Sequence, residues 1–585
     1  MTLQSDQTTP MISDELKGFL QGLAKAEVVA LDTETTGLKI KTTDYLQGLS
    51  LAYRLGGMVF TAYLPFQHES GNLPMEIVPN LFHILKGKRV IFFNRKFDFH
   101  SLFTLYPAFQ LNDTVDISLL AHFINEERPY QKNLNNVGMM YVKKGKTGKD
   151  EIDKFTEALG WGNVPPHLMD AYARGDAELT LELYEKLWPM FQKKFGDKAD
   201  ELINWEDRMN LALYNMEHRG IHVDQKFCRQ YEGIANIEMD NVVDELGFVP
   251  SKTKDLSQFL FDELKLPVLK RSEKTGKPSL DKAVMEDYER MLEVRAEDNT
   301  RVRLVLDYRG WQKAASTFYA PFQFLADEEG RIHCNYNQNG TVTGRLSASE
   351  PNLQQIPRTS NKAWNGRIRS AFRASEGYDL VGYDYSQLEF RLAAAYGQEE
   401  WLIEEFAKED ADPFTVLAER IGTDRYTAKT FTYAMIYGAG KDKIAATLKR
   451  TVTDIEDPYN AFLATIPGII KAKSVAQAKA KSRGYIRYWT GRRRHFPDPS
   501  RSYKAFNSLL QGGGAEVVKR VLVLCNENVC DDNCRLLLQV HDELVFEIRQ
   551  GMEDVYGPRI IDTMQSLPTN YFGVNFAVAG KKWGE

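Results

Sequence analysis

The chain has 585 residues, which is too many for a single hydrophobic core and predicts several domains. Hydrophobic residues make up 43% and charged residues 26%, as in an ordinary soluble globular protein, and no apolar run is long enough to span a membrane. The net charge of −6 argues against a uniformly basic surface for nucleic acid, but it leaves room for a local basic groove.

The N-terminal segment and the cysteines bear on cellular location. The first residues lack a basic stretch followed by an apolar stretch and are not rich in Arg, so we expect no secretory or organelle signal. The five cysteines form no paired CxxC set, which favours reduced thiols. We therefore expect a cytoplasmic protein.

The first 200 residues have the pattern of an α/β unit. Glu27–Leu38 begins as a buried strand, Arg89–Leu102 is a strand that runs into a helix, and Met169–Leu187 has helical spacing. The chain from about residue 204 to 319 is mostly charged helix, and strands and helices mix again after it. No repeat or low-complexity linker marks the boundaries between these regions.

Polar side chains in the α/β unit have spacings that place them on common faces. The pairs are Asp32 with Glu34, Asn94 with Asp98, and Tyr172 with Asp176. Residues two apart share a face of a strand, and residues four apart share a face of a helix. A solvated surface is the simpler explanation for any single pair. The ordered set of acids and one tyrosine instead points to a single site.

The segments that carry these residues resemble known nuclease motifs. DTETTGL, FNRKFD and YARGDAELT resemble the three exonuclease motifs of proofreading DNA polymerases and their DEDD-type relatives. The resemblance implies that two divalent ions, Mg²⁺ with Mn²⁺ or Zn²⁺ as alternatives, are held by Asp32, Glu34, Asp98 and Asp176. It also implies that Tyr172 orients the attacking water, and that Asn94 and Leu38 contact the end of the DNA strand. We therefore expect an active 3′→5′ exonuclease.

Two further carboxylates lie at the ends of predicted strands, far apart in the sequence. Tyr378–Gly397 is predicted as a strand that ends at Asp384, followed by a helix, and Leu536–Ile548 as two strands that meet at Asp542. An Asp before a helix is commonly an N-cap, and polar residues are ordinary at a turn. The alternative is that a carboxylate at the tip of a rigid hairpin shares a metal ion with Asp384.

A helix between these two segments carries an ordered stripe. Arg425, Lys429, Tyr433 and Tyr437 recur at intervals of four, with the cations first and the rings after. Such a helix suits a nucleotide, because cations neutralise a triphosphate and a ring packs on the sugar and base. A basic end on an amphipathic helix is the simpler alternative.

A basic and aromatic segment follows this helix. KSRGYIRYWTGRRRH, residues 481–495, interleaves Lys and Arg with Tyr and Trp. This mixture suits phosphate contact together with base stacking, although a charged run is commonly only a solvated face. Arg492 within it is our candidate for a DNA contact.

These segments resemble the polymerase motifs of family A DNA polymerases, the bacterial DNA polymerase I group and its bacteriophage relatives. DYSQLEFR resembles motif A, RYTAKTFTYAMIYG motif B and QVHDE motif C, and TGRLSASEPNLQQIP, GRRRHFP and NSLLQGGGAE also match. The resemblance implies an α/β multidomain fold. An RNase H-like exonuclease domain (residues 1–200) would be followed by a right-hand polymerase domain (201–585), with no 5′ nuclease domain ahead of them. The thumb would span about 204–320, the fingers about 400–500, and the palm about 325–400 and 500–585.

The resemblance also assigns roles to residues of the polymerase domain. Asp384 and Asp542 would bind two Mg²⁺ ions with the Tyr385 carbonyl, and Glu543 and Lys429 would join them in catalysis. The nucleotide would be bound by Arg425, Lys429, Tyr433, Tyr437, Glu389, Gln387 and His541. DNA would be contacted by Arg345, Gln354, Asn507, Gln511 and Arg492. Tyr433 stands where the bacterial enzymes usually have Phe, which predicts easy incorporation of dideoxynucleotides.

The predicted function is DNA-dependent DNA synthesis with proofreading, in DNA replication. Primer-template DNA and dNTPs are the predicted partners of a monomer without membrane contact, with a helicase and a single-strand binding protein as replisome candidates. Tyr433 favours a bacteriophage enzyme in the host cytoplasm, and an organellar or bacterial origin stays open. The alternatives are a single-subunit RNA polymerase, which the exonuclease half and Glu389 argue against, and a binding protein with an inactive polymerase lobe.

Overall fold

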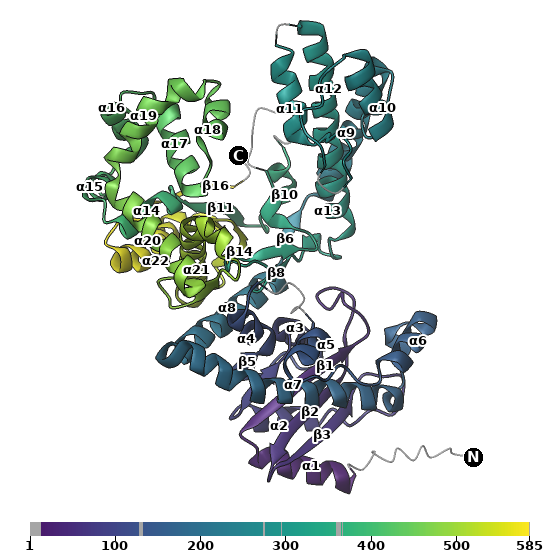
Figure 1. Cartoon of the computed structure of the whole chain (residues 1–585). Helices are drawn as coiled ribbons and strands as arrows, with labels where there is room; N and C mark the ends of the chain where they lie inside the picture. Colours follow the sequence, from purple (N-terminus) through teal and green to yellow (C-terminus); the bar gives the residue numbers. More distant parts are fainter. Residues whose placement is uncertain are drawn as a thin grey trace.

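The chain forms two bodies, one above the other in Figure 1. The computed structural model describes residues 13–127, 133–272, 275–293, 295–357, 364 and 367–583. The lower body contains the N-terminal part of the chain, and the long helix α8 (Ala199–Arg219) leads from it to the upper body. No helix in the described part of the chain is both long and apolar enough to cross a membrane.

The lower body is built on a five-stranded mixed sheet with the strand order β3-β2-β1-β4-β5. The strands are β1 (Val28–Thr35), β2 (Leu46–Leu55), β3 (Met58–Pro65), β4 (Arg89–Phe92) and β5 (Asp113–Asp116). β1 pairs antiparallel with β2 and parallel with β4. Alternate residues of β1 belong to separate hydrophobic clusters, with Val29 and Leu31 in one and Ala30 in the other. The sheet is therefore buried on both faces.

Helices cover this sheet. They are α1 (Asp14–Lys25), α2 (Ile77–Leu85), α3 (Arg95–Leu105), α4 (Ile117–Ile124), α5 (Leu134–Tyr141), α6 (Lys149–Leu159) and α7 (Pro166–Phe195). The longest of them, α7, contacts β1, β2 and β3, so residues along it can face the end of β1. The α/β character expected for this part of the chain is confirmed.

The centre of the upper body is a four-stranded antiparallel sheet with the order β14-β15-β11-β16. Its strands are β11 (Tyr378–Tyr385), β14 (Cys534–Val540), β15 (Glu543–Arg549) and β16 (Val578–Lys582). The expected hairpin is confirmed, because β14 and β15 pair on either side of a turn at His541 and Asp542. The helices that follow or precede these strands are α14 (Leu388–Gly397), α21 (Ala505–Asn528) and α22 (Glu553–Phe572).

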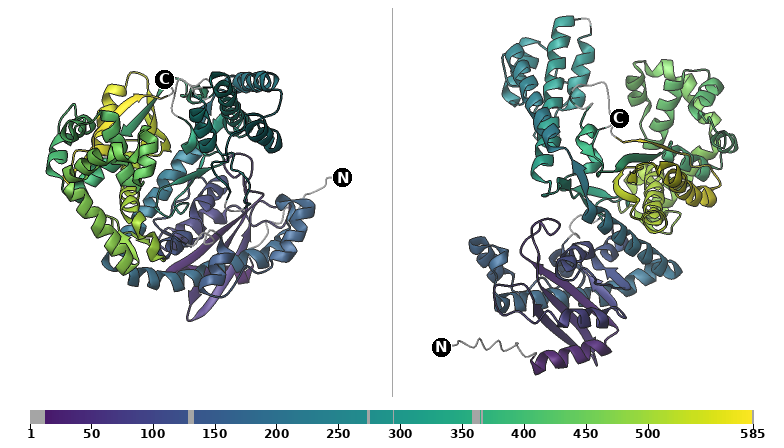
Figure 2. Two further views of the ribbon diagram at one scale, coloured as in Figure 1. Left: turned by 45° about the horizontal axis from the view of Figure 1, so that its top comes forward. Right: turned by 180° about the vertical axis from the view of Figure 1, so that it is seen from behind.

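Two helical groups stand on opposite sides of this sheet, as the front and rear views both show (Figures 1 and 2). The first, coloured teal, comprises α9 (Gln225–Leu246), α10 (Thr253–Ser257), α11 (Lys282–Met291), α12 (Ala296–Lys313) and α13 (Ala320–Phe324). The second, coloured green, comprises α15 (Glu400–Phe406), α16 (Pro413–Ile421), α17 (Arg425–Tyr437), α18 (Lys441–Leu448), α19 (Val452–Thr465) and α20 (Pro467–Arg483). The first group has a hydrophobic cluster of its own, whereas the second shares the large cluster of the sheet.

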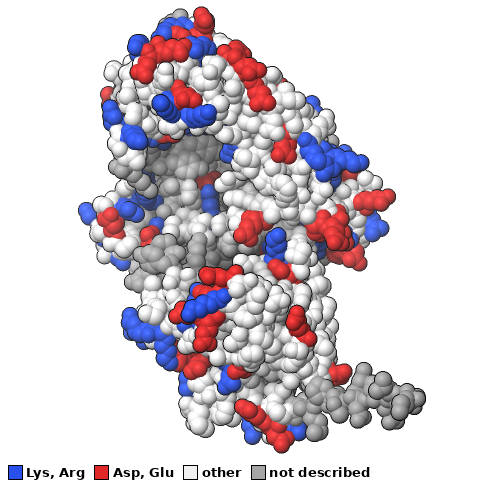
Figure 3. Space-filling view, turned by 90° about the vertical axis from the view of Figure 1, so that its right-hand side faces the viewer, with Lys and Arg blue, Asp and Glu red and all other residues white. Residues whose placement is uncertain are grey.

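Short strands complete the upper body. They are β6 (Ile221–Val223), β7 (Arg331–Ile332), β8 (Asn335–Asn337), β9 (Ser347–Ser349), β10 (Phe372–Arg373), β12 (Tyr485–Arg487) and β13 (Arg493–His495). The face shown in Figure 3 is hollowed in its upper half, and acidic and basic side chains are interspersed over it. On this face the surface is not uniformly basic, in agreement with the net charge.

Buried ion pairs join the two bodies. Glu217, near the end of α8, is 1% exposed and forms an ion pair with Lys96 of α3. Its second oxygen lies 3.2 Å from Lys41 Nζ and 3.2 Å from His100 Nε2. The backbone N–H of Tyr336 donates to the same carboxylate at 2.6 Å. One carboxylate of the connecting helix therefore contacts donors from both bodies and links the lower body to β8.

Candidate active sites

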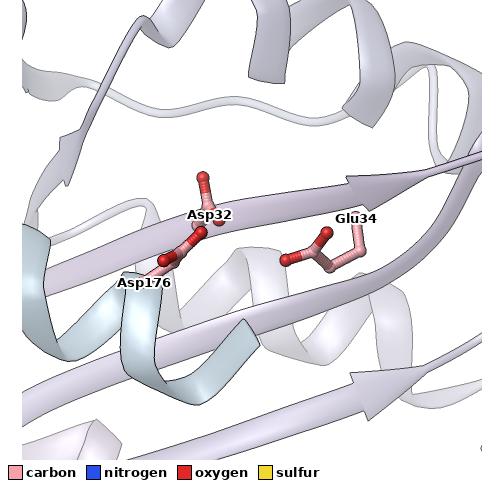
Figure 4. A group of neighbouring side chains, drawn as sticks. All are labelled: Asp32, Glu34 and Asp176. Carbon is pink, nitrogen blue, oxygen red and sulfur yellow. The ribbon is translucent and has the colours of Figure 1, made fainter. Parts of the chain in front are cut away.

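Three acids of the lower body converge at the end of β1. Asp32 and Glu34 come from β1 and Asp176 comes from α7, and one carboxylate oxygen of each lies within 4.8 Å of the others. Figure 4 shows the Glu34 carboxylate pointing towards those of Asp32 and Asp176. A spacing of this size allows the three oxygens to surround one cation.

The seven residues predicted for the exonuclease site line one cavity of about 510 Å³. They are Asp32, Glu34, Leu38, Asn94, Asp98, Tyr172 and Asp176. Leu38 is 87% exposed at the rim, so its apolar side chain is available to a ligand. The expectation that Asn94 shares a helix face with Asp98 is wrong. α3 begins one residue later, and Asn94 has a left-handed backbone with φ of 72°.

Burial and mutual repulsion shape the acidity of this cluster. Burial raises the pKa of Asp32 to about 7, and the charge of Asp176 adds to the effect while Lys146 opposes it. Burial also raises the pKa of Glu34 and Asp98, and the charge of Asp32 adds to both. Buried acids that repel one another are stabilised by a bound cation.

Unsatisfied oxygens show where such a cation fits. Within the described structure, Glu34 Oε1, Asp98 Oδ2 and Asp176 Oδ1 are buried and have no hydrogen-bond partner. The other oxygen of Asp98 accepts a hydrogen bond from Thr33 Oγ1 at 2.8 Å, which orients its carboxylate. Carboxylate oxygens are the ligands that hard divalent cations prefer, so these residues fit the metal ions implied by the motifs.

Lys146 is a component of this site that the sequence motifs missed. Its Nζ lies 2.5 Å from Asp176 Oδ2 and donates to Tyr172 Oη at 2.7 Å. The segment KKGKTGK contains four lysines, and nothing in their spacing distinguishes the one that enters the cavity. Only the packing of this segment against α7 could have identified it.

The sheet of the upper body brings Asp384 and Asp542 together. Asp384, near the end of β11, pairs with Glu543, the first residue of β15, and Asp542 directly precedes Glu543. Paired Cα atoms of antiparallel strands lie about 4.5–5.5 Å apart, so the two aspartates occupy neighbouring backbone positions. The simpler interpretation of Asp384 as an N-cap does not hold, because Gln387 precedes α14, with φ of 59°.

Glu543 is buried below this pair. The residue is 2% exposed, and its Oε2 accepts a hydrogen bond from Arg369 at 3.2 Å. A side chain at Gly382 would meet Glu543 Oε1 at 2.4 Å, so the missing Cβ there makes room for the acid. The buried Glu543 carboxylate thus packs at the start of β15 and contacts Arg369. Its predicted role in catalysis stays a prediction.

A cavity of about 320 Å³ lies beside the hairpin tip. Of the predicted residues, it is lined by Arg345, Gln354, Glu389, Tyr437, His541 and Asp542. Arg345 forms an ion pair with Glu389 at 2.7 Å, and Gln354 donates to Gln539 Oε1 at 2.6 Å. Burial raises the pKa of Tyr437, and the charges of Glu389 and Asp542 add to this. The last ring of α17 is therefore within electrostatic reach of the hairpin tip.

The predicted stripe lies on the accessible face of α17. Arg425, Lys429 and Tyr437 are exposed and Tyr433 is half-buried, whereas the opposite face of the helix is buried. Phe414 of α16 supports the stripe, with the Arg425 guanidinium 5.7 Å and Lys429 Nζ 6.0 Å from its ring centroid. Sequence analysis missed Phe414, because a single Phe in an amphipathic helix carries no signal.

Arg492 does not face solvent, so its predicted contact with DNA is wrong. Its side chain is 4% exposed, and its Nη1 lies 3.2 Å from Glu206 and 3.4 Å from Glu516. It packs over the ring of Phe123 in the lower body. The guanidinium therefore belongs to the contact between the two bodies.

Asn507 and Gln511, by contrast, are half-buried one turn apart on α21.

Comparison with known proteins decides the family. Residues 223–585 match the model of DNA polymerase family A, and residues 8–192 match that of the 3′-5′ exonuclease domain. The chain belongs to DNA polymerase family A. Its exonuclease domain is followed by the polymerase domain, as the motifs predicted.

Two relatives of this family A chain are bacterial enzymes. DNA polymerase I of Pseudomonas aeruginosa is 27% identical over 569 residues, which cover 91% of this chain and 61% of that protein. The thermostable DNA polymerase I of Thermus aquaticus is 33% identical over 403 residues, which cover 63% of this chain and 46% of that protein. The chain thus spans about half to three fifths of the length of these curated relatives.

A solved structure shares the whole fold. The polymerase domain of Pol1 from M. smegmatis, in complex with DNA primer-template and dNTP, superposes with a TM-score of 0.81. The alignment covers 98% of each chain at 22% sequence identity. This similarity confirms the arrangement of the family A fold.

Proposed function

We propose that the chain is a template-directed DNA polymerase that adds dNTPs to a primer 3′-OH and proofreads with a 3′→5′ exonuclease. The observation that carries the proposal is the pairing of Asp384 with Glu543, which brings motifs A and C together beside the cavity that Tyr437 of α17 also lines. The primer-template and dNTP bound to the related Pol1 domain support the choice of substrates.

In the polymerase site, Asp384, Asp542 and the Tyr385 carbonyl would hold two Mg²⁺ ions. When bound, such ions lower the pKa of the primer 3′-OH and stabilise the charge on the leaving pyrophosphate. The exposed cations of α17, Arg425 and Lys429, neutralise the triphosphate. Lys429 also donates a proton to the leaving group.

Neighbouring side chains select the nucleotide and check the base pair. Tyr433 packs on the sugar and base, Tyr437 gates the template base, and Glu389 excludes a 2′-OH. Gln387 and His541 complete the nucleotide site beside the primer end. Arg345, Gln354, Asn507 and Gln511 donate to the minor groove. Its acceptors are common to all four correct base pairs, so these donors test the shape of a pair without preferring a sequence.

In the exonuclease site, the four acids Asp32, Glu34, Asp98 and Asp176 would hold two divalent ions. Such ions stabilise both the attacking hydroxide and the leaving 3′ oxygen of an in-line displacement. Tyr172 orients the attacking water. Leu38 and Asn94 at the rim of the cavity hold the strand end.

We also propose a division of the chain into domains. We assign residues 1–200 to the exonuclease domain and 201–585 to the polymerase domain, with α9–α13 as thumb, the four-stranded sheet as palm and α15–α20 as fingers. The enzyme would act as a monomer in DNA replication. A helicase and a single-strand binding protein as partners, and a bacteriophage origin, stay predictions.

Paired variants test the two activities. Asp384→Asn is expected to lower primer extension with Mg²⁺ and dNTPs at least about a hundredfold while single-strand degradation continues, because it alters only the polymerase site. Asp32→Ala is expected to do the reverse. Extension by Asp384→Asn at the wild-type rate would overturn the polymerase assignment, and unchanged degradation by Asp32→Ala would overturn the exonuclease assignment.

The same assay separates the rival functions. Primer extension with dNTPs yields a deoxy product for a DNA polymerase. A single-subunit RNA polymerase would need ribonucleotides, and a binding protein with an inactive lobe would give no product. Product from ribonucleotides alone, or no product, would therefore contradict the proposed function.

A further inference from the structure

Lys146 enters the exonuclease cavity from outside the three motifs. It lies between α5 and α6, and its side chain is 20% exposed. The ammonium group bridges Asp176 Oδ2 at 2.5 Å and Tyr172 Oη at 2.7 Å, and it lies 4.7 Å from the centroid of the Tyr172 ring. It thus contacts both residues that α7 contributes to the site.

Close backbone packing holds this lysine in place. The N–H of Lys146 donates to Asn135 Oδ1 of α5 at 3.1 Å. The next residue, Thr147, rests on α7, where a Cβ at Gly175 would meet its Oγ1 at 2.1 Å. The absence of a side chain at Gly175 therefore lets this segment approach α7. Lys146 is anchored on both sides, unlike a mobile surface lysine.

The contact between Lys146 and Asp176 matters because acids outnumber cations in the cavity. Four acids line the cavity, and among its described lining residues Lys146 is the sole Lys or Arg. Asp176 is one of the three acids whose oxygens converge within 4.8 Å. The same carboxylate that would bind a divalent ion is therefore engaged by a fixed ammonium group.

We propose that Lys146 is a positioning residue of the exonuclease reaction, which serves as the internal counter-cation of Asp176 and orients the Tyr172 hydroxyl. Its positive charge opposes a divalent ion near Asp176, because like charges a few ångströms apart repel strongly inside a protein. Its hydrogen bond directs the hydroxyl that orients the attacking water. This inference rests on the proposed exonuclease function.

The charge effect is tested by Mn²⁺ binding, measured from the electron paramagnetic resonance of the free ion. All proteins compared are the full chain with Asp384→Asn and Asp542→Asn, which removes the carboxylates of the polymerase site. Lys146→Met is expected to tighten Mn²⁺ binding at least about tenfold, since it removes the opposing charge and keeps the length of the side chain.

Lys144 provides a matched control, two residues earlier in the same segment. It pairs with Glu182, and its side chain is 58% exposed. Lys144→Met is expected to leave Mn²⁺ affinity unchanged. Equal affinity in the two lysine variants, or weaker binding in Lys146→Met, would overturn the proposal. Asp32→Ala in the same background should lose Mn²⁺ binding, and unchanged binding there would instead refute the metal site itself.

The positioning effect is tested by degradation of single-stranded DNA at saturating Mn²⁺, in the chain with Asp384 and Asp542 intact. Lys146→Met is expected to be about 10- to 100-fold slower than wild type, as is typical when a partner of a site residue is lost. Lys144→Met should match wild type. A rate for Lys146→Met equal to that of Lys144→Met would overturn the positioning role, and undiminished primer extension by Lys146→Met would verify its fold.

Discussion

Tyr433 stands at the centre of the stripe on α17, between the cations and the last ring. Its ring stacks on that of Tyr437, with a centroid distance of 6.0 Å and an interplanar angle of 13°, and lies 6.0 Å from Phe414. These neighbours hold the ring on the accessible face of the helix, where a bound nucleotide would meet its hydroxyl. Tyr433 differs from a Phe by one oxygen atom, so a single substitution can test the role of its hydroxyl.

Tyr433→Phe is expected to raise discrimination against dideoxynucleotides about 10- to 100-fold. The hydroxyl would replace contacts that the nucleotide 3′-OH makes, and a hydrogen bond to a charged group is worth about 1.5–3 kcal/mol. The measurement is the ratio of kcat/KM for dATP to that for ddATP. Tyr426→Phe is the control, because Tyr426 is 61% exposed on the same helix but outside the stripe. Strong discrimination by the wild type, unchanged in Tyr433→Phe, would refute this role.

The strand β11 is the element on which the proposed polymerase site depends. It is the central partner of both β15 and β16, and its far end carries Asp384. Gly382, two residues before Asp384, leaves room for the buried carboxylate of Glu543 and for Trp583. The positions of Asp384, and of Asp542 next to Glu543, are thus coupled to a packing contact under the strand.

Gly382→Ala is expected to destabilise the polymerase domain by about 1–3 kcal/mol and to reduce primer extension more than single-strand degradation. The new Cβ would lie 2.4 Å from Glu543 Oε1 and 2.8 Å from Trp583 Cδ1, so the strands must shift. Urea unfolding and the two activities are measured together. Gly233→Ala in α9, where a Cβ meets nothing within 4 Å, should be neutral or slightly stabilising. Equal behaviour of the two variants would show that the sheet tolerates the methyl group.

Elements defined by local pattern were predictable from the sequence. The hairpin at Asp542 followed from two apolar runs, and the face of α17 followed from an interval of four, because both patterns repeat within a few residues. The pairing of β11 with β15 could not be derived in this way. Its register depends on side chains from distant parts of the chain, and only the resemblance of the motifs implied it.

Individual placements that depend on tertiary contacts were missed. Asn94 has helical spacing to Asp98, yet its left-handed backbone lies outside α3. Arg492 belongs to a segment whose mixture of basic and aromatic residues favours DNA contact. Its side chain is nevertheless buried and forms ion pairs with Glu206 and Glu516. Lys146 is one of several similar lysines, and its contact with Asp176 depends on how one loop packs on α7. No local pattern carries this information.

At the scale of the whole molecule, α8 connects the two bodies and carries Glu217 at their contact. Burial alone would raise the pKa of Glu217, but the ammonium groups of Lys96 and Lys41 hold it well below its ordinary value. The carboxylate is therefore charged, and it is the shared partner of Lys41 and Lys96 from the lower body. This buried network joins the two bodies, so we expect a change in it to alter the relative placement of the two proposed active sites without touching either.

Glu217→Ala is expected to lower the free energy of unfolding by about 3–5 kcal/mol, because it leaves the buried ammonium of Lys96 without its acid. The contact between the bodies should loosen, so limited proteolysis near α8 should become faster and removal of a mismatched primer end should fall more than degradation of free single strands. Glu185→Ala is the control, since its pair with Arg54 is 38% exposed on both sides and such surface pairs are worth about 0–1 kcal/mol. Proteolysis and proofreading that are the same in both variants would show that Glu217 does not hold the two bodies together.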